Sequence, residues 1–221
     1  MVRFTHLTPH SRSGMLSLGE VEQVAESLKQ GSPAVLPTET GYMLAVLATS
    51  EVALKAAFTV KGRSPAAVMH VACASLDMAR AVGIMTGRAS RLLCQFTPGP
   101  LSVIVNKTDL LPDDLVALNG TVGIRVPDHP ATLQVISAVG APLTATSLNS
   151  SGSHLTSVSE ASLRTLNWPE VEVVYVVQDD AAIAYDSPST LVRVSGDALE
   201  VLRPGPISAS EIERVAVGLE P

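Results

Sequence analysis

Residues 101–126 read LSVIVNKTDLLPDDLVALNGTVGIRV, and this stretch decides the fold class of the chain. Its two ends, 101–105 and 122–126, are short runs rich in β-branched residues, and turn-forming residues bound each run. That pattern is typical of buried strands. Apolar residues at helical spacing precede the first run at 89–96 and follow the second at 130–139. Strands and helices that alternate in this way predict an α/β fold with a mixed sheet flanked by helices.

The alternation continues in both directions along the chain. Helical spacing over 18–28 ends at Gly31, a residue type that often terminates helices. No fixed repeat and no long linker interrupts the pattern, so we predict an N-terminal arm over 1–14 and one domain over 15–221, built on a single twisted, largely open sheet. Further strands are predicted at 34–36, 43–48, 67–72, 142–146, 171–177, 190–194 and 199–202, and further helices at 52–60, 76–82 and 207–217.

The composition limits the functional classes. Fifteen basic and 21 acidic residues give a net charge of -6, so any contact with a nucleotide or RNA needs a local basic cluster. Aromatic residues make up only 3% of the chain, too few for a platform that stacks several bases. The N-terminus lacks the apolar core of a signal peptide, and the apolar runs are shorter than a membrane span. We therefore expect a soluble cytoplasmic protein.

Common catalytic and binding motifs are missing from the sequence. It contains no GxxxxGK[ST] or GxGxxG phosphate loop, no HExxH zinc motif and no GxSxG nucleophile elbow. The histidines and the two cysteines, Cys73 and Cys94, do not have the spacing of metal ligands, and the cysteines fit small buried residues. We predict that no protein side chain holds a metal.

Basic residues follow several of the predicted elements. Lys61 and Arg63 follow a helix, Arg125 ends a strand, and Arg203 ends the last strand. Ligands of open α/β sheets bind at strand ends, where loops converge over a rigid scaffold. Guanidinium groups bind phosphate oxygens in pairs, and lysine adds a point charge. If these four cations lie together at the same edge of the sheet, they form an anion pocket suited to a triphosphate.

Each candidate also has a purely structural interpretation. Residues 61–63 taken alone fit a solvated turn. Ser147 and Asn149 fit turn residues that bond the local backbone, and His70 fits a satisfied core histidine. Arg125 is harder to explain in this way, because a charge inside a buried strand needs either an acidic partner or a ligand.

Seven motifs occur in order between about Gly31 and Ile207. They are LPTETGY (36–42), KGR (61–63), TPGPLSVIV (97–105), VGIRVPDHP (122–130), TSLNSSG (146–152), PSTLV (188–192) and LRPGPI (202–207). Together they resemble the YrdC/YciO family, whose best-known members are L-threonylcarbamoyladenylate synthases. Each motif is weak alone, but seven in register are highly specific.

The resemblance implies a YrdC-like fold with a central positively charged cavity. It also implies a nucleotidyltransferase that converts L-threonine, bicarbonate and ATP with Mg²⁺ into threonylcarbamoyl-AMP and pyrophosphate. The product is the precursor for modification of adenosine 37 in certain transfer RNAs. The implied partners are tRNA or double-stranded RNA and proteins of the threonylcarbamoyl transfer pathway. Two alternatives stay open, a non-catalytic RNA-binding or regulatory paralogue of the YciO type and a carbamoyl transferase that uses another acceptor.

Site residues follow from the resemblance position by position. Lys61 and Arg63 would be catalytic and would hold the ATP phosphates. Arg125 would pair with the carboxylate of threonine. The complete nucleotide site would be Lys61, Arg63, Ser147, Asn149 and Arg203, and the threonine site would be Thr40, His70, Arg125 and Ser189.

The sequence departs from the synthase pattern in two places. Family synthases usually read Thr-Val-Tyr-Gly-Leu-Gly where residues 40–45 read TGYMLA, so Met43 replaces a glycine at a point where close backbone approach is expected. Residues 64–70 are shorter than in the family and lack a Pro-Leu pair. Gly41-Tyr42 and the segment 146–148 are closer to the YciO branch. We therefore expect the ATP half of the site to match the family better than the threonine half.

Overall fold

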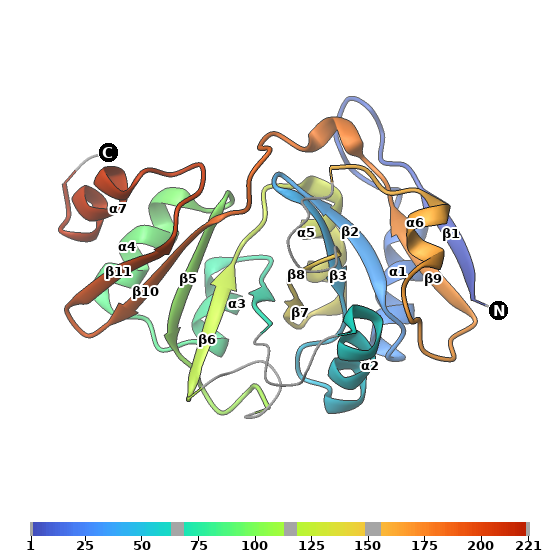
Figure 1. The fold of residues 1–221 in the computed structure, drawn as a ribbon, viewed down its shortest axis with the longest axis horizontal. Coiled ribbons are helices and arrows are strands. Elements are labelled where there is room, and N and C mark those ends of the chain that lie inside the picture. Colours follow the sequence, from blue (N-terminus) through green and yellow to red (C-terminus); the bar gives the residue numbers. More distant parts are fainter. Residues whose placement is uncertain (1, 63–68, 113–118, 149–155, 220–221) are drawn as a thin grey trace.

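The computed structural model describes residues 2–62, 69–112, 119–148 and 156–219. Its strands form two mixed sheets side by side, with helices packed against them (Figure 1). The α/β fold class with a mixed arrangement of strands is therefore confirmed. The first sheet has the order β1 (Arg3–Leu7), β9 (Val173–Val177), β2 (Ala34–Thr38), β3 (Gly41–Ala45) and β8 (Thr146–Ser147). The second has the order β11 (Ala198–Arg203), β10 (Thr190–Ser195), β5 (Leu101–Asn106), β6 (Thr121–Arg125), β4 (Val71–Ala72) and β7 (Leu143–Thr144).

The prediction of one continuous sheet is wrong in the described part of the chain. Among the described residues, a short backbone link between residues 46–48 and 142–144 connects the two sheets. Ala48 N donates to Pro142 O at 3.0 Å, and Thr144 N donates to Val46 O at 2.9 Å. Strands β4, β7 and β8 are two residues long. A continuous ladder needs longer partners at the junction, so the sheet divides there.

The N-terminal segment is part of the first sheet. Strand β1 pairs in parallel with β9, from Arg3 opposite Val173 to Leu7 opposite Val177. The predicted N-terminal arm therefore contains a strand at residues 3–7 that is paired in the first sheet. Its backbone finds partners in a strand near the other end of the chain, and no local pattern in the sequence reveals such a partner.

Hydroxyl side chains set the starts of most described helices. A Ser or Thr at the N-cap accepts a hydrogen bond from a backbone N–H in the first turn of α1, α2, α3, α4, α6 and α7. In α7 the N-cap is Ser208. The helices are α1 (Leu18–Lys29), α2 (Glu51–Lys61), α3 (Leu76–Val82), α4 (Gly87–Phe96), α5 (Pro130–Val139), α6 (Glu160–Arg164) and α7 (Ala209–Ala216).

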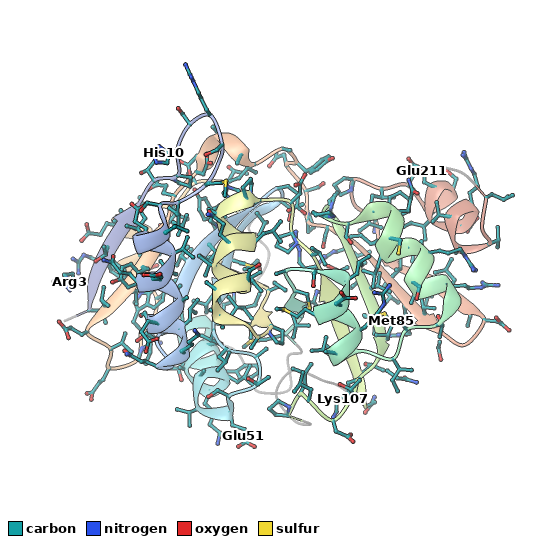
Figure 2. The ribbon with its side chains drawn as sticks, turned by 180° about the vertical axis from the view of Figure 1, so that it is seen from behind. Arg3, His10, Glu51, Met85, Lys107 and Glu211 are labelled. Carbon is teal, nitrogen blue, oxygen red and sulfur yellow. The ribbon has the colours of Figure 1, made fainter. Side chains whose placement is uncertain are left out.

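The helices cover the sheets unevenly. Helices α1 and α5 pack against each other over the first sheet, and seen from behind they lie beside α3 and α4 on the same side of the molecule (Figure 2). Helix α2 lies on the opposite side of the first sheet, in front of β3 (Figure 1). The short helix α6 and the 3-10 turn Asp180–Ala182 were not predicted, because each is too short to show a periodic pattern.

Strand β3 separates two hydrophobic clusters. Its alternate residues Tyr42 and Leu44 belong to one cluster, while Met43 and Ala45 belong to the other, together with buried residues of α1 and α5. Met43 is almost fully buried. The long side chain that replaces the family glycine is therefore accommodated in the core. Of the two cysteines, Cys73 is buried as predicted, but Cys94 is exposed on the outer side of α4.

No helix among the described residues is long and apolar enough to cross a membrane.

Substitution of Gly205 tests the packing that holds the last strands. A Cβ at this position would lie 2.4 Å from the backbone N of Thr190 and 2.7 Å from the carbonyl O of Pro188. Because backbone atoms cannot rotate away, we expect Gly205→Ala to destabilise the protein by about 1–3 kcal/mol in urea unfolding. The control is Gly19→Ala in α1, where nothing lies within 4 Å of the added Cβ. Equal stabilities of the two variants would contradict the prediction.

Candidate functional site

The turn between β2 and β3 forms one wall of the candidate site. Thr38 Oγ1 accepts a hydrogen bond from Thr40 N at 3.2 Å and donates to Gly41 O at 2.7 Å. Gly41 has a φ of 106°, which favours glycine and lets the chain reverse within two residues. The turn buries the side chains of Glu39 and Thr40.

Arg125, the last residue of β6, reaches this turn from the second sheet. Its Nη2 lies 2.6 Å from Glu39 Oε1 and 3.2 Å from Thr40 Oγ1. The side chain of Arg125 is 9% exposed, and its Nε has no hydrogen-bond partner among the described residues. The charge inside the predicted strand therefore has an acidic partner and also retains a buried donor for a further group.

Arg203, the last residue of β11, is held at the start of β10. Its Nη2 donates to Ser189 O at 2.9 Å and its Nε donates to the same oxygen at 3.2 Å. Ser189 Oγ lies 2.9 Å from Ser102 Oγ in β5. Burial, and next the positive charge of Arg125, lower the pKa of Arg203. The two guanidinium groups therefore lie close enough to repel each other.

His70 stands just before β4 and packs on β6 of the second sheet. A Cβ on Gly123 of β6 would lie 2.4 Å from Cδ2 of the His70 ring, so the ring packs directly on the glycine backbone. Burial lowers the pKa of His70 to about 4, with smaller contributions from Arg203 and Arg125. The imidazole is therefore neutral at pH 7 and adds no charge to the site.

Lys61, at the end of α2, contacts Ser147 in the short strand β8. Lys61 is the last residue of α2, and Gly62 ends the helix in the left-handed conformation with a φ of 57°. Lys61 is only 7% exposed, and its Nζ donates to the carbonyl oxygen of Ser147. Ser147 pairs with Met43 in β3, the strand that begins at the turn of Thr40. The interpretation of residues 61–63 as a solvated turn is therefore wrong for Lys61.

The structure brings together most of the predicted site residues that it describes. Thr40 contacts Arg125, Ser189 contacts Arg203, and the charges of both arginines act on His70. Lys61 and Ser147 form a second pair, and Ser147 belongs to β8, the strand next to β3. The remaining two candidates, Arg63 and Asn149, lie outside the described residues.

Glu39 is a site residue that the sequence analysis passed over. It stands in the PTETG turn, one position before Thr40, and it supplies the acidic partner that Arg125 requires. The demand of a buried arginine for a counter-ion is visible in the sequence. Which of the 21 acidic residues meets that demand is not visible, because the two residues are far apart along the chain.

The model of the Sua5/YciO/YrdC family, which is described as "Telomere recombination", matches residues 26–205 of the chain. The chain belongs to this family. Membership confirms the resemblance that the seven motifs indicated.

Curated relatives share about a third of their aligned residues with the chain. It is 33% identical over 183 residues to a threonylcarbamoyl-AMP synthase of Mus musculus, an alignment that covers 82% of this chain and 62% of the relative. The enzyme of the same name from Bacillus subtilis is 31% identical over 199 residues, with coverages of 89% and 56%. A putative threonylcarbamoyl-AMP synthase of Mycobacterium tuberculosis is 33% identical over 190 residues, with coverages of 86% and 85%. The chain thus spans about six tenths of the length of the mouse and Bacillus relatives.

Solved structures share the fold. Sua5 of P. abyssi in complex with L-threonine superposes with a TM-score of 0.83 at 24% identity, over 99% of this chain and 62% of that one. YciO of E. coli superposes with a TM-score of 0.80 at 23% identity, over 96% and 100% of the two chains. At these identities the likeness establishes the fold alone, and it confirms the predicted relation to YrdC-like folds.

The pKa of His70 tests the electrostatics of this site. The group is expected to titrate near pH 4 in the folded protein and near pH 6.5 in the unfolded chain. Between these values the unfolded chain binds more protons, so stability falls as the pH falls from about 6.5 toward 4. NMR titration of the imidazole measures the folded value, and His70→Gln should remove this part of the pH dependence. A titration near pH 6.5 in the folded protein would contradict the arrangement.

Proposed function

We propose that this chain is an ATP-dependent threonylcarbamoyl-AMP synthase. One observation carries the proposal: in an acidic protein, the charges of Arg125 and Arg203, from different strands, lie close enough to interact, and Arg125 keeps an unpaired Nε beside the buried turn. Such a pair suits a small carboxylate next to a phosphate. Relatives named threonylcarbamoyl-AMP synthase, and a Sua5 structure that contains L-threonine, support the same assignment.

The proposed reaction proceeds in two steps. The nitrogen of the L-threonine amine first forms a bond to the carbon of carbon dioxide derived from bicarbonate and loses a proton, which gives the carbamate. An oxygen of the resulting carbamate then attacks the α-phosphorus of ATP, the bond to the β-phosphate oxygen breaks, and pyrophosphate leaves. Negative charge builds on the phosphate oxygens, so positioning and fixed positive charges supply most of the rate enhancement.

The threonine half of the site is assigned to the second sheet and the turn. Arg125 would pair with the threonine carboxylate, and Thr40, Ser189 and His70 would complete the pocket. A neutral His70 fits this role because it leaves the two guanidinium charges for the anions. In the free protein Ser189 Oγ lies 3.2 Å from Arg203 Nη2, so threonine would join an existing hydrogen-bond network.

The nucleotide half is assigned to Lys61, Arg63, Ser147, Asn149 and Arg203, with Lys61 and Arg63 holding the phosphates. Both carboxylate oxygens of Glu39 already accept hydrogen bonds, one from Arg125 and one from the backbone N of Asp128. Mg²⁺ therefore fits here as an ion held by phosphate oxygens, where it would neutralise charge on the leaving pyrophosphate.

The product defines the wider role in this proposal. Threonylcarbamoyl-AMP is a mixed anhydride, so it needs an acceptor nucleophile, which we assign to adenosine 37 of tRNA in the cytoplasm with the help of proteins of the transfer pathway. Direct binding of tRNA or double-stranded RNA is a separate property of the same proposal. Loss of RNA affinity with rising salt would reveal phosphate contacts.

Pyrophosphate release from ATP tests the proposed activity. Release should require both threonine and bicarbonate. Lys61→Ala should lower kcat/KM for ATP by about 100-fold, because a buried charge-assisted contact is lost, and Arg63→Ala should act in the same direction.

The matched control is Lys55→Ala. Lys55 lies on the same helix α2 but is exposed, in a 3.9 Å ion pair with Glu51, and its loss should leave the rate unchanged. A threonine-independent release that survives both Lys61→Ala and Arg63→Ala would refute the assignment.

A further inference from the structure

Glu39 is the point at which the two sheets and their connection meet. Its Oε1 accepts from Arg125 Nη2 at 2.6 Å, and its Oε2 accepts from the backbone N of Asp128 at 2.9 Å. Both oxygens are therefore used, one by β6 and one by the loop between β6 and α5. The side chain of Glu39 is 4% exposed, so water contributes little to its solvation.

The backbone of Glu39 is also held. Its carbonyl oxygen accepts from Ala184 N at 2.9 Å and from Tyr185 N at 3.0 Å. These residues belong to the connection that leaves β9 in the first sheet, crosses the top of the molecule and enters β10 in the second sheet (Figure 1). The carboxylate therefore stands on a turn that cannot easily move.

The contacts of Arg125 leave its remaining donors available. Both contacts of the guanidinium among the described residues use Nη2, which donates to Glu39 and approaches Thr40. Nε stays buried without a partner. A guanidinium has five N–H groups, so three of them, on Nε and Nη1, remain for a further anion.

Repulsion makes this orientation dependent on a restraint. The positive charge of Arg125 lowers the pKa of Arg203, and the nearby imidazole of His70 is neutral. Without a restraint, the Arg125 side chain would rotate so that its guanidinium moved away from Arg203. The contact with Glu39 opposes that movement and sets which edge of the guanidinium faces the site.

We propose that Glu39 is a positioning residue that orients Arg125 for the carboxylate of the amino acid substrate. The inference deepens the proposed function and rests on it. Glu39 does not touch the substrate in this scheme. It acts through Arg125. Its negative charge makes the site less positive and so weakens anion binding, but the orientation that it gives to Arg125 outweighs this effect.

Two other roles for Glu39 predict different results. If its charge were the main effect, removing it would make the site more positive and would tighten the binding of threonine. If the ion pair served stability alone, its loss would lower the stability of the protein and leave the KM for threonine unchanged. Positioning predicts weaker threonine binding in spite of the more positive site.

The experiment measures pyrophosphate release by the full chain with Glu39→Gln. Glutamine keeps the shape but presents an amide NH₂ to one of the two donors, so Arg125 loses its charged anchor. We expect KM for threonine to rise by about 10- to 100-fold, the range of a lost charge-assisted contact, while KM for ATP changes less than about twofold. Glu160→Gln, which breaks the exposed ion pair with Arg164, is the matched control and should change neither value.

A double-mutant cycle separates orientation from folding. In an Arg125→Lys background, Glu39→Gln should cause no further rise in KM for threonine, because a lysine has no planar edge to orient. Glu39→Asp keeps the charge with a shorter side chain, and it replaces Glu39→Gln in the cycle if circular dichroism shows that the glutamine variant is unfolded.

The outcomes distinguish this inference from the proposed function. An active wild type with an unchanged or lower KM for threonine in Glu39→Gln, or additive effects in the cycle, would overturn the positioning role alone. A wild type without threonine-dependent release would overturn the proposed function, and the positioning role would fall with it.

Discussion

The candidate site depends on a buried ion pair between the two sheets. Glu39 stands on the β2–β3 turn of the first sheet, and Arg125 ends β6 of the second. Removing two charges from water is costly, and the cost is recovered only when the geometry is good and the remaining lone pairs are satisfied. Glu39 meets that condition through Asp128 N, whereas Arg125 does not, since its Nε is unpaired. Both carboxylate oxygens of Glu39 therefore have hydrogen-bond partners, whereas the guanidinium of Arg125 keeps a buried N–H without one.

That asymmetry explains how an acidic protein can present a cationic site. Strands β6 and β11 bring Arg125 and Arg203 close enough for their charges to interact, and the ring of His70, on which both charges act, stays neutral. Two arginines thus lie near one junction, although the chain as a whole carries a net charge of -6. A local field of this kind attracts small anions without making the whole surface attractive to polyanions.

Local sequence patterns predicted the elements that depend on local interactions. Every described α-helix except α6 was predicted, because the 3.6-residue spacing of apolar residues acts within a few residues. The strands β5 and β6 were found because β-branched runs between turns are distinctive. Strand β1 and the division into two sheets were missed, because each depends on a partner strand remote in sequence. The anion site, inferred from charges at strand ends, stays a prediction, and the acidic partner of Arg125 was not predicted.

Arg125 and two glycines show what the sequence could predict and what it could not. The sequence by itself determined an α/β chain with Arg125 in an apolar strand, and it required that this charge have a partner or a ligand. Only the tertiary structure decided that Glu39 is the partner, that Gly123 leaves room for His70, and that Gly205 lets the backbone approach β10. The physical reason is that helix caps and strand patterns act over a few residues, whereas ion pairing and close backbone approach act between atoms that only folding brings together.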